Sequence, residues 1–155
     1  IRLNPAHKNI DYVFYMRGLT NMAADYNFFQ DFLGIDRDDK DPSYARQAFQ
    51  DFKTLLQNYP NSQYAADARA RMVGLKTRLA RYDLGVAEYY VKRDALIAAA
   101  NRAKLVVETY PDTVETEKAL EIMVNAYDTL KMPTLARHAR EVLAKNYPDN
   151  RIGRG

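Results

Sequence analysis

The chain has 155 residues, of which 47% are hydrophobic and 28% charged, a composition typical of one folded domain or a short array of repeats. It contains no cysteine, which excludes disulfides, thiolate metal sites and cysteine nucleophiles, and no apolar run approaches the roughly 18 residues of a membrane span. The net charge of +3 is uneven, because residues 62–104 carry nine lysines and arginines against four acidic residues. Such an excess is more often a solvated helix face than a binding site.

The first predicted helix pair covers residues 9–58. Apolar and aromatic residues recur at helical spacing up to about residue 29, namely Tyr12, Tyr15, Leu19, Met22 and Tyr26. A polar, acidic loop at 31–41 follows. It ends in Asp41-Pro42, which predicts a capping residue and the first residue of a second helix at 43–58.

The second predicted pair, at 62–109, is built on an unusually long helix at about 62–93. Its apolar positions alternate in steps of four and three residues, the spacing of a single buried stripe: Ala68, Met72, Leu75, Leu79, Tyr82, Val86 and Tyr89. Glycines at 74 and 85 allow a bend at either position. The shorter partner helix is expected to begin after a cap at Asp94.

The third predicted pair covers 113–146, with a tight break at Met132-Pro133-Thr134 between its helices. Residues 151–155 carry no pattern and are predicted to be disordered. We therefore expect one domain at 1–150 followed by a short tail.

A short phrase closes each pair: Asn58-Tyr59-Pro60, Thr109-Tyr110-Pro111 and Asn146-Tyr147-Pro148. Each tyrosine follows an alanine by eleven residues (Ala48, Ala99, Ala136) and an aliphatic residue by four (Leu55, Val106, Leu143). Proline ends the helix because it lacks an N–H and restricts the residue before it. Repeated helix pairs of this kind resemble tetratricopeptide repeats, whose standard unit is about 34 residues. The expected fold is an all-α superhelix of about three helix pairs, without strands.

The sequence contains no constellation that indicates catalysis. The two histidines, His7 and His138, lie in separate repeats, and neither has a partner at metal-ligand spacing. The acidic cluster Asp36–Asp41 fails as a calcium loop, because Lys40 occupies a ligand position and Asp41 replaces the required glycine. We therefore predict no enzymatic activity, no metal and no cofactor. The twelve tyrosines are expected to pack mainly in the core rather than to stack on bases.

Several phrases resemble the BamD (ComL) family, tetratricopeptide-repeat lipoproteins of the bacterial outer-membrane β-barrel assembly machinery. They are Ile1-Arg2-Leu3-Asn4-Pro5, Tyr15–Met22, Tyr59–Tyr64, Val86–Tyr90 and the loop elements Asp36-Arg37 and Asp41-Pro42. The resemblance extends from residue 1 to about 150. It implies that the chain is the C-terminal portion, roughly the last three of five repeats, of a protein lipid-anchored at the periplasmic face of the outer membrane.

The resemblance also implies partners. Family members bind the membrane-proximal POTRA domain of the barrel-forming subunit BamA and contact the lipoproteins BamC and BamE. Asn101-Arg102 matches the family's Asn-Arg pair, whose arginine faces that POTRA domain. We expect Arg102 to reach outward as the anchor, with Asn101, Arg93 and Lys104 as further partner-binding residues. The family usually has Arg-Gly after the long helix, and Arg93-Asp94 in this chain argues against a left-handed turn there.

Two other functions remain open at this point. A tetratricopeptide groove could hold an extended peptide, and Asn101, Arg102 and Lys104 would then contribute to a carboxylate clamp. Nucleic-acid binding would use the basic segment 62–104, but its acidic flanks argue against a long phosphate-tracking surface. The sequence favours a non-catalytic scaffold that holds a folded partner domain.

Overall fold

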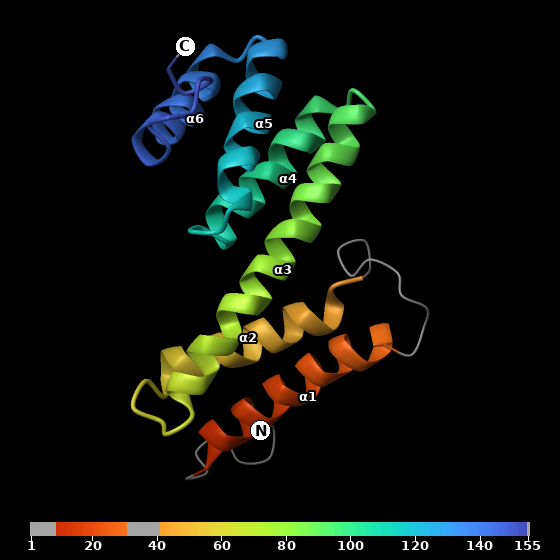
Figure 1. Ribbon diagram of the computed structural model, residues 1–155, viewed down its shortest axis with the longest axis vertical. Coiled ribbons are helices and arrows are strands. Elements are labelled where there is room, and N and C mark those ends of the chain that lie inside the picture. Colours follow the sequence, from red (N-terminus) through yellow and green to blue (C-terminus); the bar gives the residue numbers. More distant parts are fainter. Residues whose placement is uncertain (1–8, 31–40, 155) are drawn as a thin grey trace. The chain divides into compact units, whose positions relative to one another are not determined.

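The computed structural model describes residues 9–30 and 41–154, except for the side chains of 26–30. All regular structure in these ranges is helical, as predicted (Figure 1): α1 (Ile10–Gln30), α2 (Ser43–Asn58), α3 (Ala65–Lys92), α4 (Leu96–Thr109), α5 (Glu115–Thr129) and α6 (Pro133–Asn146). Within the same ranges, none of the helices combines the length and hydrophobicity that a bilayer crossing requires. The junction at Ile1–Pro5, His7 and most of the acidic loop lie outside the described residues.

The chain divides into two compact units, residues 1–79 and 80–155. In the first unit α1 packs on α2, and in the second α4 packs on α5 and α5 on α6. Helix α3 contributes its N-terminal half to the first unit and its C-terminal half to the second.

The first unit packs α1 along a line that differs from the predicted stripe. Tyr12 is 45% exposed, whereas Ile10, Gly18 and Asp25 are buried. The reason is the fully buried ring of Phe52 on α2: a Cβ at Gly18 would lie only 2.6 Å from its Cε1 atom. Because Gly18 has no side chain, the Phe52 ring packs closely against α1 at that point. This contact determines which face of α1 is buried.

The long central helix is confirmed, but its buried stripe is right only in its first half. Helix α3 begins three residues later than expected because Ser62–Tyr64 form a turn, and it runs unbroken through both glycines. Ala68, Leu75 and Leu79 are buried as predicted, after which the buried positions are Ala80, Asp83 and Ala87. Tyr89, predicted to be buried, is 49% exposed. The two halves of the helix therefore bury different faces, one in each unit.

The closing phrase of each pair has the same backbone in all three copies. The tyrosines have φ angles of −134°, −125° and −132°, and each N–H donates to the carbonyl four residues earlier. The alanines and aliphatic residues that precede them at fixed distances are at most 1% exposed: Ala48, Leu55, Ala99, Val106, Ala136 and Leu143. The sequence repeat therefore corresponds to equivalent buried positions in each helix pair.

The expectation about Asp94 was wrong on both counts. Asp94 has a left-handed backbone with φ 57°, and it does not cap α4, because Ala95 precedes that helix without a side-chain cap. The Ala95 N–H donates to the Tyr90 carbonyl and the Asp94 N–H to the Val91 carbonyl, both at 3.0 Å. This is the Schellman ending of a helix, which satisfies the last carbonyls whether or not glycine is present. Lys131, also at φ 57°, ends α5 in the same way.

Replacing Lys131 by glycine is expected to raise the free energy of unfolding by up to about 1 kcal/mol. A left-handed residue with a Cβ costs about 1–2 kcal/mol, offset in part by the greater freedom of glycine in the unfolded chain. Urea denaturation measures the change. Lys145→Gly in the last turn of α6 is the matched control and should lower stability by up to about 1 kcal/mol. A loss of equal size for Lys131→Gly would contradict the prediction.

The tail also differs from expectation, since residues 151–154 form a turn rather than a structureless end. The Asn150 Oδ1 atom accepts the Ile152 N–H at 3.0 Å, and the Arg154 Nε donates to the Pro148 carbonyl at 2.7 Å. Gly153 packs against α6 so closely that a Cβ would lie 2.9 Å from the Ala144 nitrogen. These contacts depend on individual residues, so the periodicity of the sequence does not predict them.

Candidate partner-binding site

The four residues predicted to bind a partner all lie in the second unit, on α4 or just after α3. Asn101 and Lys104 are exposed on α4, and the Lys104 Nζ lies 3.5 Å from Glu108 Oε1. Arg93 is exposed beyond the end of α3, and its guanidinium lies over the ring of Tyr89 at 4.8 Å from the centroid. Three of the four side chains are therefore on the surface.

Helix α4 positions these residues because one of its faces is made of small and aliphatic side chains. Ala99, Ala103 and Val106 are fully buried at steps of four and three residues. That spacing turns Asn101 and Lys104 to the outside, while Arg102 falls at the edge of the buried face. Alanine at two of the buried positions lets α4 approach its neighbours closely.

Arg102 has a partner inside the chain, which the sequence analysis missed. Its Nη1 donates to Asp83 Oδ1 on α3 at 3.0 Å, and Asp83 is fully buried. The Arg102 side chain remains 33% exposed. The sequence did contain a sign of this pair. Asp83 lies three residues after Ala80 and four before Ala87, so it shares one helical face with two small apolar residues, and a carboxylate on such a face needs a partner.

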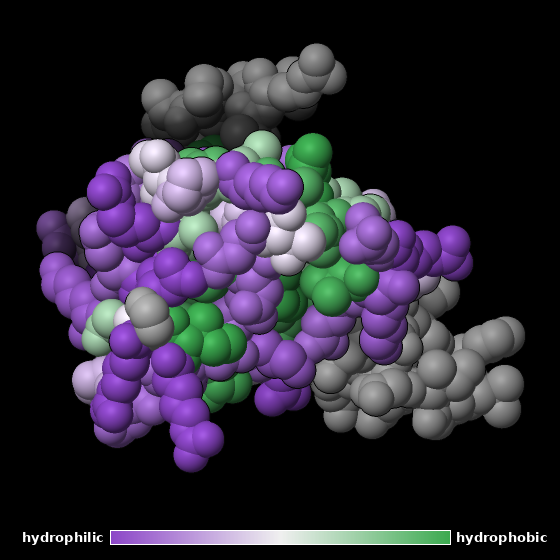
Figure 2. All heavy atoms as spheres, turned by 90° about the horizontal axis from the view of Figure 1, so that it is seen from above, coloured by the Kyte–Doolittle hydropathy of each residue, from purple (hydrophilic) through white to green (hydrophobic). Residues whose placement is uncertain are grey.

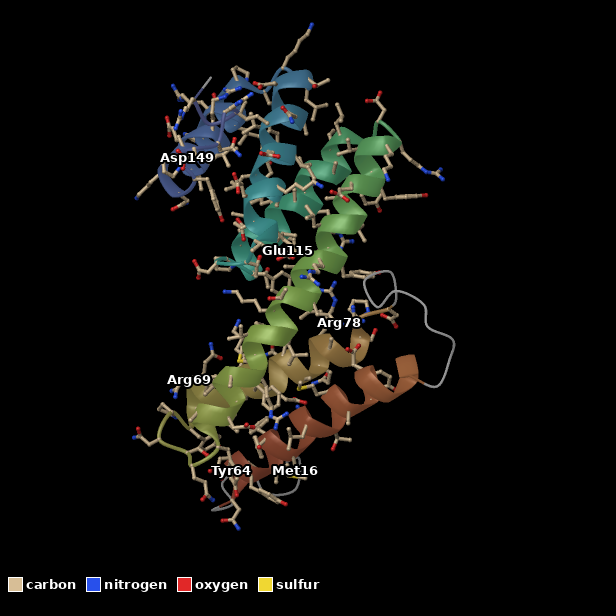
Figure 3. The ribbon with its side chains drawn as sticks, viewed as in Figure 1. Met16, Tyr64, Arg69, Arg78, Glu115 and Asp149 are labelled. Carbon is tan, nitrogen blue, oxygen red and sulfur yellow. The ribbon has the colours of Figure 1, made fainter. Side chains whose placement is uncertain are left out.

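Two further ion pairs tie α3 to α5 in the second unit. The Arg81 Nε lies 3.0 Å from Glu115 Oε1, and Glu115 is buried at the start of α5 (Figure 3). The Lys118 Nζ lies 2.6 Å from Glu88 Oε1, and that hydrogen bond raises the pKa of Lys118. Both pairs leave their basic members largely exposed to solvent.

Much of the positive charge concentrated in 62–104 is engaged with carboxylates of the same chain. Besides Arg81 and Arg102, Arg71 pairs with Asp67 at 2.6 Å, and the buried Arg78 pairs with Asp25 at 3.0 Å. A basic surface that tracks nucleic acid needs cations directed at phosphates. The internal pairing therefore argues against that function.

Apolar side chains are exposed next to the predicted residues, another feature the sequence did not reveal. Ile97 is exposed on α4, four residues before Asn101 and seven before Lys104, so the three share one face. Tyr89 and Val91 are exposed near the end of α3. The surface visible in Figure 2 is mostly hydrophilic, with apolar residues in small separate groups. An exposed aliphatic side chain bordered by polar groups matches the apolar core and polar rim of protein interfaces, with Lys104 at the rim.

The chain matches a family model described as an outer membrane lipoprotein, YfiO, over residues 1–143. It is 50% identical over 145 residues to the outer membrane protein assembly factor BamD of Vibrio cholerae, covering 94% of this chain and 60% of the relative. The proteins of the same name from Pasteurella multocida and Neisseria gonorrhoeae are 45% and 46% identical over 92% and 95% of this chain, and 55% of each relative is covered. The chain thus spans little more than half the length of these relatives.

Proposed function

Because the chain belongs to the YfiO family of outer membrane lipoproteins, we propose that it is part of a non-catalytic scaffold subunit of the β-barrel assembly (BAM) complex. Its relatives are named as outer membrane protein assembly factors, which supports a role in the assembly and insertion of outer-membrane proteins. The proposed location is the periplasmic face of the outer membrane, with a lipid anchor on the full-length protein.

The proposed contact is with the membrane-proximal POTRA domain of BamA, through the outer face of α4 and the end of α3. The supporting observation is the geometry of Arg102. Asp83 holds one N–H of the guanidinium, and the partly exposed side chain has further N–H donors for a carboxylate on the partner. A side chain that is already fixed loses less conformational entropy on binding. The internal ion pair therefore prepares Arg102 to act as an anchor.

The neighbouring residues supply the remaining parts of a protein interface. Asn101 and Lys104 offer exposed polar groups on either side of Arg102 in the sequence, and Arg93 with Tyr89 offers a stacked cation and ring. Aromatic residues and arginine are enriched at the energetically dominant positions of interfaces. We place BamC and BamE as further partners of the same complex, without assigning residues to them.

The peptide-receptor alternative has weaker support. A carboxylate clamp requires basic groups that converge on the end of a peptide, but Arg102 and Lys104 are two residues apart on α4 and therefore do not face the same side of the helix. A peptide from a barrel precursor is expected to bind this chain more weakly than the POTRA domain does.

Titration of the chain with each isolated POTRA domain of BamA tests the proposed contact. Isothermal titration calorimetry should show saturable binding of the membrane-proximal domain and much weaker binding of the others. A C-terminal peptide from a barrel precursor, run beside them, tests the alternative. Equal binding of all POTRA domains, or tighter binding of the peptide, would contradict the proposal.

A further inference from the structure

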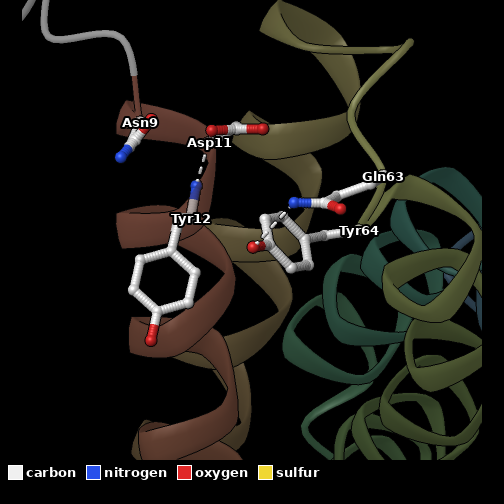
Figure 4. Close-up of a pocket in the computed structure, with 5 residues that line it drawn as sticks. All are labelled: Asn9, Asp11, Tyr12, Gln63 and Tyr64. Atoms are coloured by element: carbon white, nitrogen blue, oxygen red, sulfur yellow. Dashed lines mark hydrogen bonds between the residues drawn. The ribbon is translucent and has the colours of Figure 1, made fainter.

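The first unit contains a small open pocket where α1 begins, away from the predicted partner-binding residues in sequence. Its volume is about 360 Å³, and the lining residues are Asn9, Asp11, Tyr12, Gln63 and Tyr64 (Figure 4). Ligand sites usually measure about 300–1,000 Å³. This pocket is at the lower end of that range, which suits one side chain rather than a larger ligand.

Two tyrosine rings form the aromatic part of the pocket. The rings of Tyr12 and Tyr64 have centroids 5.7 Å apart and are tilted by 47°. Tyr64 is held in place, because its ring stacks on Tyr15 at 4.6 Å and its hydroxyl accepts the Gln63 Nε2 hydrogen at 3.0 Å. Tyr12 is half exposed at the rim. The negative faces of such rings attract cations.

The carboxylate of Asp11 borders the same space, held by two neutral donors. Its Oδ1 accepts the Tyr12 N–H at 2.8 Å, and its Oδ2 accepts the Ser62 hydroxyl at 2.7 Å. These hydrogen bonds orient the group without neutralising its charge. The carboxylate is therefore oriented, and among the described residues no cation is paired with it.

Asp11 differs in this respect from the other at least half-buried aspartates of the first unit. Asp25, Asp51 and Asp67 each form an ion pair with an arginine. Among the residues that the structure describes, Asp11 has hydrogen bonds only to a backbone N–H and a hydroxyl. An oriented carboxylate beside two aromatic rings combines the two groups that bind a guanidinium or an ammonium in proteins.

We propose that this pocket binds one basic side chain, an arginine or a lysine, of a partner protein. The cation would pair with Asp11 while its apolar stem and charge contact the rings of Tyr12 and Tyr64. The proposal is independent of the POTRA contact, which uses residues of the second unit. It predicts a second, separate point of attachment in the first unit.

The test uses N-acetylarginine amide as the probe and N-acetylcitrulline amide as its neutral isostere. Ring resonances of Tyr12 and Tyr64, followed by NMR in the whole chain, should shift saturably with the arginine compound in the millimolar range. The citrulline compound should bind at least about fivefold more weakly, since it lacks the charge that both the carboxylate and the rings attract. Equal binding of the two probes, or no saturable shift with arginine, would overturn the proposal.

Two variants test whether the Asp11 carboxylate is the group that binds the cationic probe. Asp11→Asn keeps an acceptor for the Tyr12 N–H but should remove the preference for arginine over citrulline. Asp41→Asn is the matched control, because Asp41 also accepts hydrogen bonds from a serine, Ser43, but is exposed and lies outside the pocket. It should leave the preference unchanged. If both variants reduce the preference equally, the probe responds to overall charge and the pocket is not the site.

Discussion

Replacing Arg17 by methionine is expected to lower the free energy of unfolding by about 3–5 kcal/mol, the usual cost of leaving a buried charge without its partner. Asp51 on α2 is fully buried and accepts hydrogen bonds from Arg17 Nε at 2.9 Å, Asn21 Nδ2 at 3.0 Å and Gln47 Nε2 at 3.1 Å. The hydrogen bond to Asp51 raises the pKa of Arg17, so the guanidinium stays protonated. With methionine at position 17, the Asp51 carboxylate would keep hydrogen bonds only from the neutral amides of Asn21 and Gln47.

Urea denaturation of the whole chain measures this loss, with Arg71→Met as the control. Arg71 pairs with Asp67 on one helix, and each side chain keeps more than a third of its surface exposed to water, so that pair is expected to contribute less than about 1 kcal/mol. Asp51→Asn should cost less than Arg17→Met, because it leaves a half-exposed guanidinium that water can solvate. Equal losses for Arg17→Met and Arg71→Met would show that the buried carboxylate does not govern stability.

Truncation of Phe52 to alanine is expected to cost about 3–5 kcal/mol, through lost apolar burial and the cavity left behind. The ring is fully buried and joins α2 to α1, where it fills the space that Gly18 leaves and lies 6.2 Å from the ring of Tyr15. Tyr44→Ala, on the same helix but half exposed, is the control and should change stability by less than about 1 kcal/mol.

A double-mutant cycle tests whether Gly18 and Phe52 are matched. Gly18→Ala alone should cost about 1–3 kcal/mol, because the added Cβ would meet the ring at 2.6 Å. In a Phe52→Leu background the same change should cost less, since the smaller side chain leaves room for the methyl group. Calorimetric melting of the four proteins gives the coupling. An identical cost of Gly18→Ala in both backgrounds would contradict the close approach.

The parts of the fold that were predictable from the sequence rest on local backbone chemistry. The prolines after Tyr59, Tyr110 and Tyr147 end their helices because they lack an N–H, and the structure repeats one backbone conformation there. The alanines eleven residues before each tyrosine marked positions that are buried in the structure. The length of α3 followed from apolar spacing without a proline.

The features that sequence reasoning missed depend on contacts between elements. The change of buried face along α3 arises because its halves pack in different units, which no single stripe can encode. The pairing of Arg102 with Asp83 joins residues 19 positions apart on two helices. The left-handed turn at Asp94 is stabilised by Schellman hydrogen bonds to the end of α3, which residue preference alone does not predict. The candidate site was therefore found by resemblance, and its internal ion pair only by structure.

The proposed role of Arg102 in partner binding can be separated from its role in the ion pair with Asp83 by comparing it with a second arginine, Arg81. Arg102 and Arg81 both lie in the second unit, both are partly exposed, and each pairs at 3.0 Å with a buried carboxylate, Asp83 or Glu115. Glutamine at either position keeps an N–H donor for that carboxylate, whereas glutamate at 102 would place a second negative charge against Asp83. Circular dichroism and melting should confirm that Arg102→Gln and Arg81→Gln stay folded.

Titration of the membrane-proximal POTRA domain against these two variants tests the account most directly. Arg102→Gln should weaken binding by at least about tenfold, because truncating one side of a desolvated charged pair costs about 2–5 kcal/mol. Arg81→Gln, which is not on α4, should bind within about threefold of the unsubstituted chain. If Arg102→Gln also binds within that range, or if both variants lose affinity equally, the POTRA domain is not held by Arg102.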